Sequence, residues 1–294
     1  MKNYIEKHPI IMIVIGVFGI SLSSILVRYS SAPSALTAAW RLLWTVILMT
    51  PVVLGKKTIR QEMGAMAHGT VFLSILSGLF LAIHFAVWFE SLRHTSVASS
   101  TTIVCTEVIW VSLGYCLFLK GKLSWKAILA ICVTLGGSIL IALSDSAAGE
   151  TNFYGDILAL IAAAAVAVYT LIGRIVRTNV STTSYTFIVY SACGALLALL
   201  CIIKGYGFFA YGISGVLVGL LLAVFSTILG HSIFSWCLKY FSPAFVSASK
   251  LCEPVAAAAM AAVLFGESMT FMQLLGGTLI LGGVLFYSRT ESGK

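Results

Sequence analysis

The chain has 294 residues, of which 60% are hydrophobic and only 10% are charged, and its formal net charge is +8. An average soluble domain carries about 25% charged residues, so a water-soluble core could not bury this much apolar surface. The basic residues lie between apolar blocks and form no continuous basic and aromatic face, which argues against nucleic acid as a partner and for the lipid bilayer as the solvent of these blocks.

The apolar blocks are about 18–25 residues long, which is the length that crosses the hydrocarbon core of a bilayer. They are too long for strands and lack the alternation of a membrane β-barrel. The expected fold class is therefore an all-α integral membrane protein. We predict ten transmembrane helices, which are residues 10–28, 36–54, 70–91, 97–119, 125–143, 153–173, 182–203, 214–238, 243–265 and 271–288.

The first block resembles a signal peptide, because Lys2 and Lys7 precede it. It continues to about Val27, however, and a cleaved signal has a shorter core. We therefore expect residues 10–28 to be retained as the first span.

The distribution of Lys and Arg predicts the orientation. With the amino terminus inside, 13 of the 18 Lys and Arg residues lie in inside segments, and only Arg28, Arg93 and Lys204 lie outside. Positive charge concentrates on the cytoplasmic side of membrane proteins. We expect a multi-pass protein of the cell (inner) membrane with both termini and loop 55–68 in the cytoplasm, and with loop 144–154 outside.

The two halves of the chain repeat each other at a shift of 146 residues. This shift places Glu107 on Glu253 and the pair Gly136-Gly137 on Gly282-Gly283. Each half holds five spans, and because five is odd, the second copy is inverted in the membrane. We predict two domains, residues 1–146 and 147–294. Inverted repeats are typical of secondary transporters, whose substrate site lies near the midplane at the repeat interface.

The segment LKYFSPAFVSASKLCEPVAAAAMAAVLFGE, residues 238–267, followed by Gly276-Gly277 and Gly282-Gly283, resembles the second EamA repeat of the drug/metabolite transporter (DMT) superfamily. Residues 84–107 look like the matching part of the first repeat, and the resemblance there rests on Trp88, Glu90, Ser91, Leu92, Thr95, Ser96 and Glu107. The resemblance implies ten helices, two EamA repeats and the export of small metabolites; a bacterial aromatic amino-acid exporter belongs to this superfamily. The first repeat departs from the second at Val108, where the second has Pro254.

Ionisable residues inside the spans are the candidates for function, because a charge at the bilayer centre costs at least ~2.5–3.5 kcal/mol and faces a cavity or a partner. Glu107 and Glu253 lie near mid-depth, where they either line the translocation path and hold a cation or a proton, or are structural. Lys250 lies three residues before Glu253, so we expect these two to pair within one helix; the alternative is that Lys250 meets a substrate carboxylate. Pro254 is expected to kink the ninth span.

Arg41 lies between Trp40 and Trp44, and we expect it to extend to the outer interface; the alternative is a bidentate contact to a substrate carboxylate. His84 and Trp88 share one helix face, and His231 lies near Trp236 in the eighth span. These rings are expected either to wall a site for an aromatic or amphipathic metabolite or to be ordinary buried residues. Glu90 is expected to pair with Arg93.

No enzyme, nucleotide-binding or metal motif is present, and the seven cysteines lie inside apolar blocks without a C-x-x-C pair. We therefore expect no cofactor and no metal. The favoured function is secondary transport, most simply export, of a small polar or zwitterionic metabolite such as an amino acid, with protons as one candidate coupling ion. The alternatives are a membrane-embedded enzyme acting on lipid and a non-transporting assembly protein. Gly215 and Gly219 form a GxxxG pattern that serves either packing or a homodimer.

Overall fold

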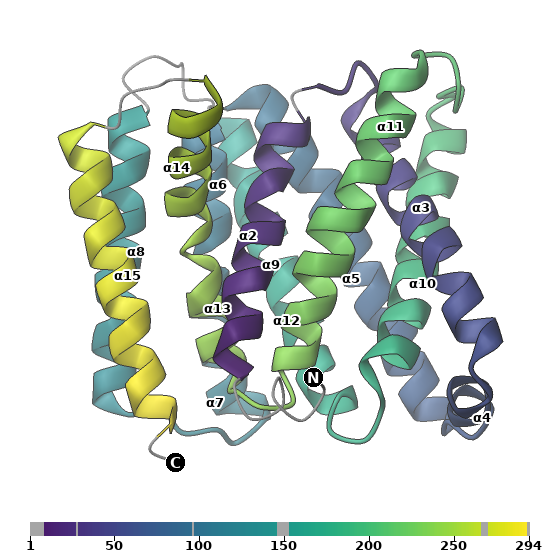
Figure 1. Cartoon of the computed structure of the whole chain (residues 1–294), viewed down its shortest axis with the longest axis horizontal. Coiled ribbons are helices and arrows are strands. Elements are labelled where there is room, and N and C mark those ends of the chain that lie inside the picture. The colour runs from purple at the N-terminus through teal and green to yellow at the C-terminus, as the bar shows by residue number, and fades with distance from the viewer. Residues whose placement is uncertain (1–8, 28, 96, 146–152, 266–269, 293–294) are drawn as a thin grey trace.

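A computed structural model describes residues 9–27, 29–95, 97–145, 153–265 and 270–292. These residues form helices that stand side by side (Figure 1), and the described part of the chain contains no strand. The elements are α2 (Pro9–Val27), α3 (Ser34–Gly55), α4 (Lys57–Gly64), α5 (His68–His94), α6 (Val97–Cys105), α7 (Glu107–Phe118), α8 (Trp125–Asp145), α9 (Phe153–Val176), α10 (Thr182–Ile203), α11 (Ile213–Leu222), the π-helix η2 (Ala223–His231), α12 (Ser232–Cys237), α13 (Pro243–Lys250), α14 (Glu253–Phe265) and α15 (Phe271–Ser292).

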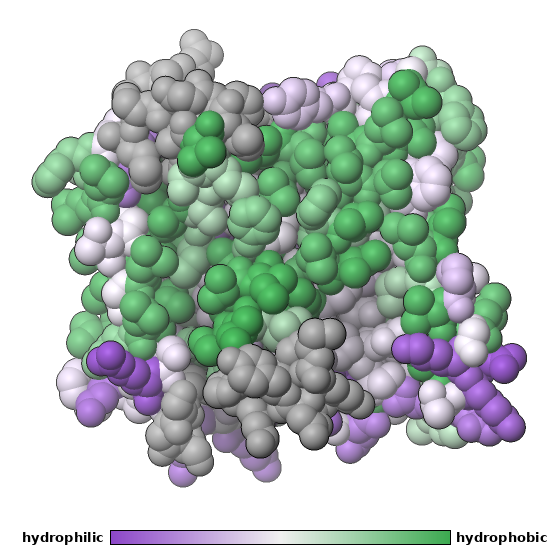
Figure 2. All heavy atoms as spheres, in the orientation of Figure 1, coloured by the Kyte–Doolittle hydropathy of each residue, from purple (hydrophilic) through white to green (hydrophobic). Residues whose placement is uncertain are grey.

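The outer surface of the bundle is apolar. Phe72, Ile203 and Leu285 are 63%, 73% and 65% exposed, and Figure 2 shows a broad hydrophobic band with hydrophilic residues gathered mainly along one edge. In the described part of the chain, eight helical stretches are long and apolar enough to cross a membrane, and α8 adds a shorter apolar stretch. α13 and α14 occupy the ninth span that the sequence predicts. The all-α membrane fold predicted from the sequence is confirmed.

Three spans differ from the continuous helices that the sequence predicted. The fourth span is divided into α6 and α7, the ninth into α13 and α14, and the eighth contains the π-helix η2. Most of the predicted outside loop 144–154, and residues 1–8 before the first span, lie outside the described residues.

Local sequence sets several helix ends. The side chain of Ser181 caps α10 by accepting a hydrogen bond from Ser184 N, and Ser242 caps α13 in the same way, with Pro243 in the first turn. Gly205 follows α10 with a φ of 71°, a left-handed conformation that glycine adopts without steric cost.

The contact between α8 and α15 shows how the two halves are related. A Cβ added to Gly137 of α8 would meet the backbone of Gly276 on α15, whereas one added to Gly283 would meet Ala130 and Thr134. The residue numbers thus rise along α8 while they fall along α15, so the two helices are antiparallel. They are the fifth spans of the two halves, and the second half is therefore inverted relative to the first.

Other helix pairs repeat this relationship. α5 packs against α9, and α2 packs against η2. The 146-residue shift places α2 on α9 and α5 on the span that contains η2, so it converts one pair into the other. The shift also relates α3 to α10, which pack against each other. The inverted arrangement leaves residues of both halves around a shared centre, where the candidate site lies.

Candidate functional site

The fourth and ninth spans break at the same point of the repeat. α6 ends at Cys105 and α7 begins at Glu107, while α13 ends at Lys250 and α14 begins at Glu253. Each glutamate is thus the first residue of a half-helix, where the helix dipole favours negative charge. The ninth break directly precedes Pro254, but the fourth occurs before Val108. A proline is therefore not required for the break.

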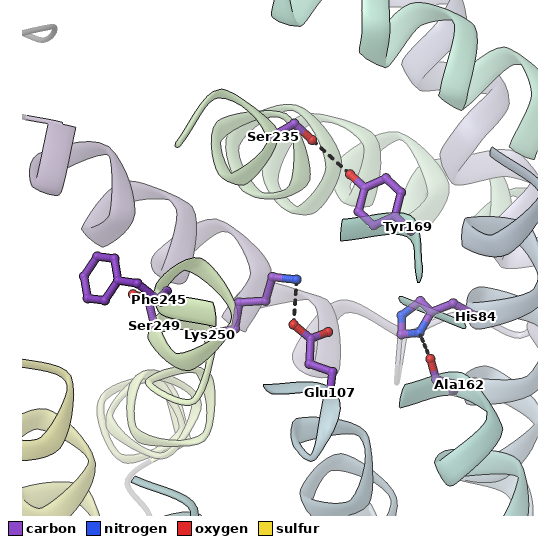
Figure 3. A network of polar contacts seen from close by, with 8 residues as sticks. All are labelled: His84, Glu107, Ala162, Tyr169, Ser235, Phe245, Ser249 and Lys250. Atoms are coloured by element: carbon purple, nitrogen blue, oxygen red, sulfur yellow. Dashed lines mark hydrogen bonds and ion pairs between the residues drawn. The ribbon is translucent and has the colours of Figure 1, made fainter. Parts of the chain in front are cut away.

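An ion pair joins the two breaks. Lys250 Nζ donates a hydrogen bond to Glu107 Oε1 at 2.8 Å, across the boundary between the halves (Figure 3). The two side chains are only 13% and 7% exposed. The expected pairing of Lys250 with Glu253 is wrong, because the break between α13 and α14 removes the regular helical spacing that brings residues three apart together.

Glu253 consequently keeps a free carboxyl group. Its backbone carbonyl accepts from Ser21 Oγ at 3.3 Å, but no described residue donates a hydrogen bond or forms an ion pair with its side chain. The side chain lines a cavity in the centre of the molecule. Glu107 and Glu253 are equivalent in the repeat, but only Glu253 remains available to another cation or a proton.

Arg41 does not extend to the outer interface, and that expectation is wrong. The residue is only 1% exposed. Nε donates to Thr227 Oγ1 at 2.7 Å, Nη1 donates to Ser23 Oγ at 3.4 Å, and the guanidinium carbon lies 4.4 Å from the ring centre of Phe85. These inward contacts replace the water that an interfacial arginine would reach. Nη2 has no partner among the described residues.

Thr227 belongs to the π-helix η2, which the sequence analysis did not predict. Its hydroxyl donates to Leu222 O at 3.3 Å, and the Ser232 hydroxyl donates to Thr227 O at 3.1 Å, both five residues apart. The wide π-turn is a deviation that occurs frequently at functional sites. Here it supplies the acceptor that fixes Arg41.

Aromatic rings form one wall of the same region. His84 stacks on Trp88 with ring centres 5.7 Å apart, and Phe85 contacts His231 edge-to-face at 5.5 Å. His84 Nδ1 donates to Ala162 O at 3.0 Å, which fixes the proton on Nδ1 (Figure 3). Trp88 Nε1 and His231 Nδ1 are buried and have no hydrogen-bond partner in the described part of the chain.

These side chains surround a cavity with about 520 Å³ of empty space, part of it open to solvent. Both halves contribute to it, α2, α3, α5, α6 and α7 from the first and α9, η2, α13 and α14 from the second. Leaving a buried donor unsatisfied costs about 1–3 kcal/mol, so we expect the unpaired groups of these residues to meet water or a polar ligand in the cavity. Its lining residues are Ile20, Ser23, Arg41, His84, Trp88, Thr101, Val104, Cys105, Glu107, Val166, His231, Lys250 and Glu253.

Seven of the eight pathway residues predicted from the sequence therefore lie around one cavity, although they come from six elements. Trp236 is the exception, because it packs on Tyr240 with ring centres 4.3 Å apart and does not line the cavity. Thr227 and Ser23, which hold Arg41, are the residues that sequence reasoning missed. In the sequence, a single Ser or Thr in an apolar span looks the same whether its hydroxyl holds a functional side chain or bonds only the backbone of its own helix.

The cavity is closed toward one end of the bundle. Along α9 and the eighth span, the cavity residues Val166 and His231 precede Tyr169 and Ser235 by about one turn, and Tyr169 OH bonds Ser235 Oγ at 3.0 Å (Figure 3). Further along, Arg174 donates to the carbonyls of Leu238 and Phe241, and Arg177 Nε donates to Ser235 O at 3.1 Å. Backbone and side chains thus seal the side that carries the carboxyl ends of α9 and α12.

Glu90 pairs with its neighbours at the other end, with Arg93 at 4.0 Å and His94 at 3.4 Å. The predicted Glu90–Arg93 pair is confirmed, and Glu90 takes no part in the cavity.

Comparisons with known proteins agree with this architecture. The sequence model of the EamA-like transporter family matches residues 8–143 and again residues 153–289. A protein of Clostridium kluyveri described as an uncharacterized transporter is 23% identical over 228 residues, which cover 75% of this chain and 73% of that protein. A solved crystal structure has a TM-score of 0.80 over 97% of this chain and 98% of its own, at 15% identity, a likeness that shows the fold alone.

Proposed function

Because the chain belongs to the EamA-like transporter family, we propose that it is a secondary transporter that exports a small polar or zwitterionic metabolite, such as an amino acid. The observation that carries this proposal is the cavity itself, which lies between two inverted halves and contains both positive and negative side chains. Substrate sites of inverted-repeat transporters lie at such interfaces, at discontinuous helices.

The breaks in the fourth and ninth spans support alternating access. A regular helix exposes no backbone hydrogen-bonding groups at mid-membrane, whereas a broken helix does so where it lines a cavity. The Lys250–Glu107 pair connects these breaks across the two halves. A substrate that competes for either partner changes the contact between the halves, and this couples occupancy to their relative motion.

We assign the structure to a state in which the cavity is closed toward the cytoplasm. In the orientation that the Lys and Arg distribution favours, the ends of α9 and α12 face the cytoplasm. That is the side closed by the Tyr169–Ser235 contact and by Arg174 and Arg177. In the inward-facing state these contacts open, and the equivalent outer segments of the first half close.

Uphill export requires an energy source, and Glu253 is our candidate proton carrier. Its carboxyl group faces the cavity without an ion partner, so it accepts or releases a proton without breaking an existing pair. Glu107 is held by Lys250, so of the two glutamates that the sequence offers as proton carriers we favour Glu253.

An untargeted comparison of metabolites between deleted and overexpressing cells tests the proposal. We expect a small metabolite to accumulate inside the deleted cells and in the medium of the overexpressing cells. Cells that express Glu253→Gln at the same membrane level serve as the matched control. Identical media and cytosols in all three strains would contradict export.

A further inference from the structure

Arg41, Trp88 and His231 line the same cavity, and each has a buried polar atom without a hydrogen-bond partner among the described residues. The atoms are Arg41 Nη2, Trp88 Nε1 and His231 Nδ1. Arg41 and Trp88 are only 1% and 7% exposed, and they reach the cavity from α3 and α5, while His231 reaches it from η2. The Arg41 and Trp88 atoms are obligatory donors.

Arg41 is fixed before any ligand arrives. Thr227 and Ser23 accept from two of its nitrogens, and Phe85 lies against the guanidinium face. Nη2 is the guanidinium nitrogen that has no partner in the described part of the chain. A preorganised planar donor of this kind suits a carboxylate, whose two oxygens accept hydrogen bonds in one plane.

The charges around the cavity determine which kind of charged ligand it favours. Lys250 and Glu107 neutralise each other at 2.8 Å, so Arg41 and Glu253 are the two cavity-lining charges that carry no ion pair in the described chain. One positive and one negative site do not favour a dianion such as phosphate, because Glu253 repels it. They favour a ligand that brings one carboxylate and one cationic group.

We propose that Arg41, with Trp88 Nε1, forms a carboxylate-binding subsite, and that Glu253 binds the ammonium group of the same ligand. This proposal rests on the proposed function for the role of the cavity, but it concerns binding and does not require transport. His231 Nδ1 completes the subsite as a donor when its proton lies on that nitrogen.

Ligand-induced thermal stabilisation of the purified protein in nanodiscs tests the subsite. The probes are the twenty protein amino acids, and for each amino acid that binds, the matching amine without the carboxylate and the matching acid without the amino group. We expect at least one amino acid to bind, and both matched analogues to bind at least tenfold more weakly. If no amino acid stabilises the protein, or if the amine binds as well as the amino acid, the carboxylate subsite is refuted. Inorganic phosphate binding more tightly than any amino acid would also overturn it.

Three variants assign the contacts. Arg41→Gln is expected to weaken amino-acid binding about tenfold or more and to leave the affinity for the amine unchanged, as loss of a charged hydrogen bond predicts. Glu253→Gln is expected to weaken binding of the amino acid but to strengthen binding of the acid without the amino group, because the variant removes a charge that repels the carboxylate. Trp88→Phe keeps an aromatic ring and removes only the Nε1 donor, so it tests the subsite even if Arg41→Gln does not fold.

Trp44→Phe is the matched control for Trp88→Phe. Trp44 Nε1 donates to Val216 O at 3.1 Å, away from the cavity, so this variant should bind like the wild type. Equal loss of binding in both tryptophan variants would show a general packing effect and contradict the subsite. Binding without transport in liposomes would leave the subsite standing and refute the proposed function, which separates the two claims.

Discussion

Lys250 of α13 lies 2.8 Å from Glu107 of α7, and this ion pair connects the breaks in the equivalent spans of the two halves. Lys250 ends its half-helix and Glu107 begins its own, so the dipoles of both half-helices favour the two charges. The pair therefore combines the Lys250–Glu107 contact with a favourable helix-dipole interaction at each of the two residues.

Removal of one partner should destabilise the protein. Glu107→Gln leaves the Lys250 ammonium buried without its counter-charge, and we expect a loss of about 3 kcal/mol. The double variant Glu107→Gln/Lys250→Gln should recover part of this loss, because no unpaired charge remains. Thermal unfolding in detergent measures both effects. Additive losses in the double variant would show that the two residues do not interact.

The close approach of Gly137 and Gly276 offers a test of the inverted packing. A Cβ at Gly137 would lie 2.6 Å from Gly276 O, and a Cβ at Gly276 would lie 2.6 Å from Gly137 O. We expect Gly137→Ala and Gly276→Ala each to cost about 1–3 kcal/mol, because two backbones have to separate.

Gly136 and Gly282 are the matched controls, since nothing lies within 4 Å of a Cβ at either position. Gly136→Ala and Gly282→Ala should be neutral or stabilising by up to about 1 kcal/mol, owing to the higher helix propensity of alanine. If Gly136→Ala and Gly137→Ala had the same effect on the melting temperature, the proposed crossing of α8 and α15 would be incorrect.

Glu62 of α4 connects the two halves outside the membrane spans. Its carboxylate accepts from Ser181 N at 2.8 Å and from the hydroxyls of Ser181 and Ser184 at the start of α10. Burial alone would raise the pKa of Glu62, but these hydrogen bonds and nearby Arg177 outweigh burial and lower the pKa below its ordinary value.

The lowered pKa of Glu62 fixes the sign of the pH effect. The contribution of Glu62 to stability is fully present above the ordinary glutamate pKa of about 4.3, and it is lost as the pH falls through the lowered native value. Wild type should therefore melt slightly above Glu62→Gln at pH 7, and the difference should shrink below about pH 4. A difference that grows with acidification would contradict the assignment.

Much of this architecture was accessible from the sequence. Block length and charge distribution predicted the ten spans, because bilayer thickness constrains helix length directly. The 146-residue shift predicted the inverted repeat and the equivalence of Glu107 and Glu253. The partner of Lys250 was not accessible, since it depends on which spans are adjacent and on a break that has no proline in the first half.

The surroundings of Arg41 were likewise not predictable from the sequence. Flanking tryptophans suggested an interfacial residue, but Thr227 and Ser23 are 186 and 18 residues away in the chain. Nothing in the local sequence predicts the π-helix that places Thr227 beside the guanidinium. Polar contacts within a membrane bundle depend on helix packing, which residue periodicity does not specify.

The orientation of the chain remains a prediction. α4 and the start of α2 lie toward the same face of the bundle (Figure 1), and Phe209, which is 76% exposed, lies in the connection on the opposite face. On a cysteine-free background, we expect a membrane-impermeant thiol reagent applied outside intact cells to label Phe209→Cys but not Lys57→Cys. The reverse labelling pattern would invert the assigned topology, and with it the side toward which the cavity is closed.

Efflux from proteoliposomes tests the central claim most directly. Vesicles containing purified protein are loaded with the twenty amino acids, and the amount that leaves each vesicle is measured by mass spectrometry with and without a pH gradient. For wild type, we predict selective efflux of at least one amino acid, accelerated by the gradient. The Glu253→Gln variant should fold normally, since it loses no ion pair, but should lose the response to the gradient. Efflux equal to that of protein-free vesicles for every amino acid would contradict transport of a zwitterion through the cavity between the two halves.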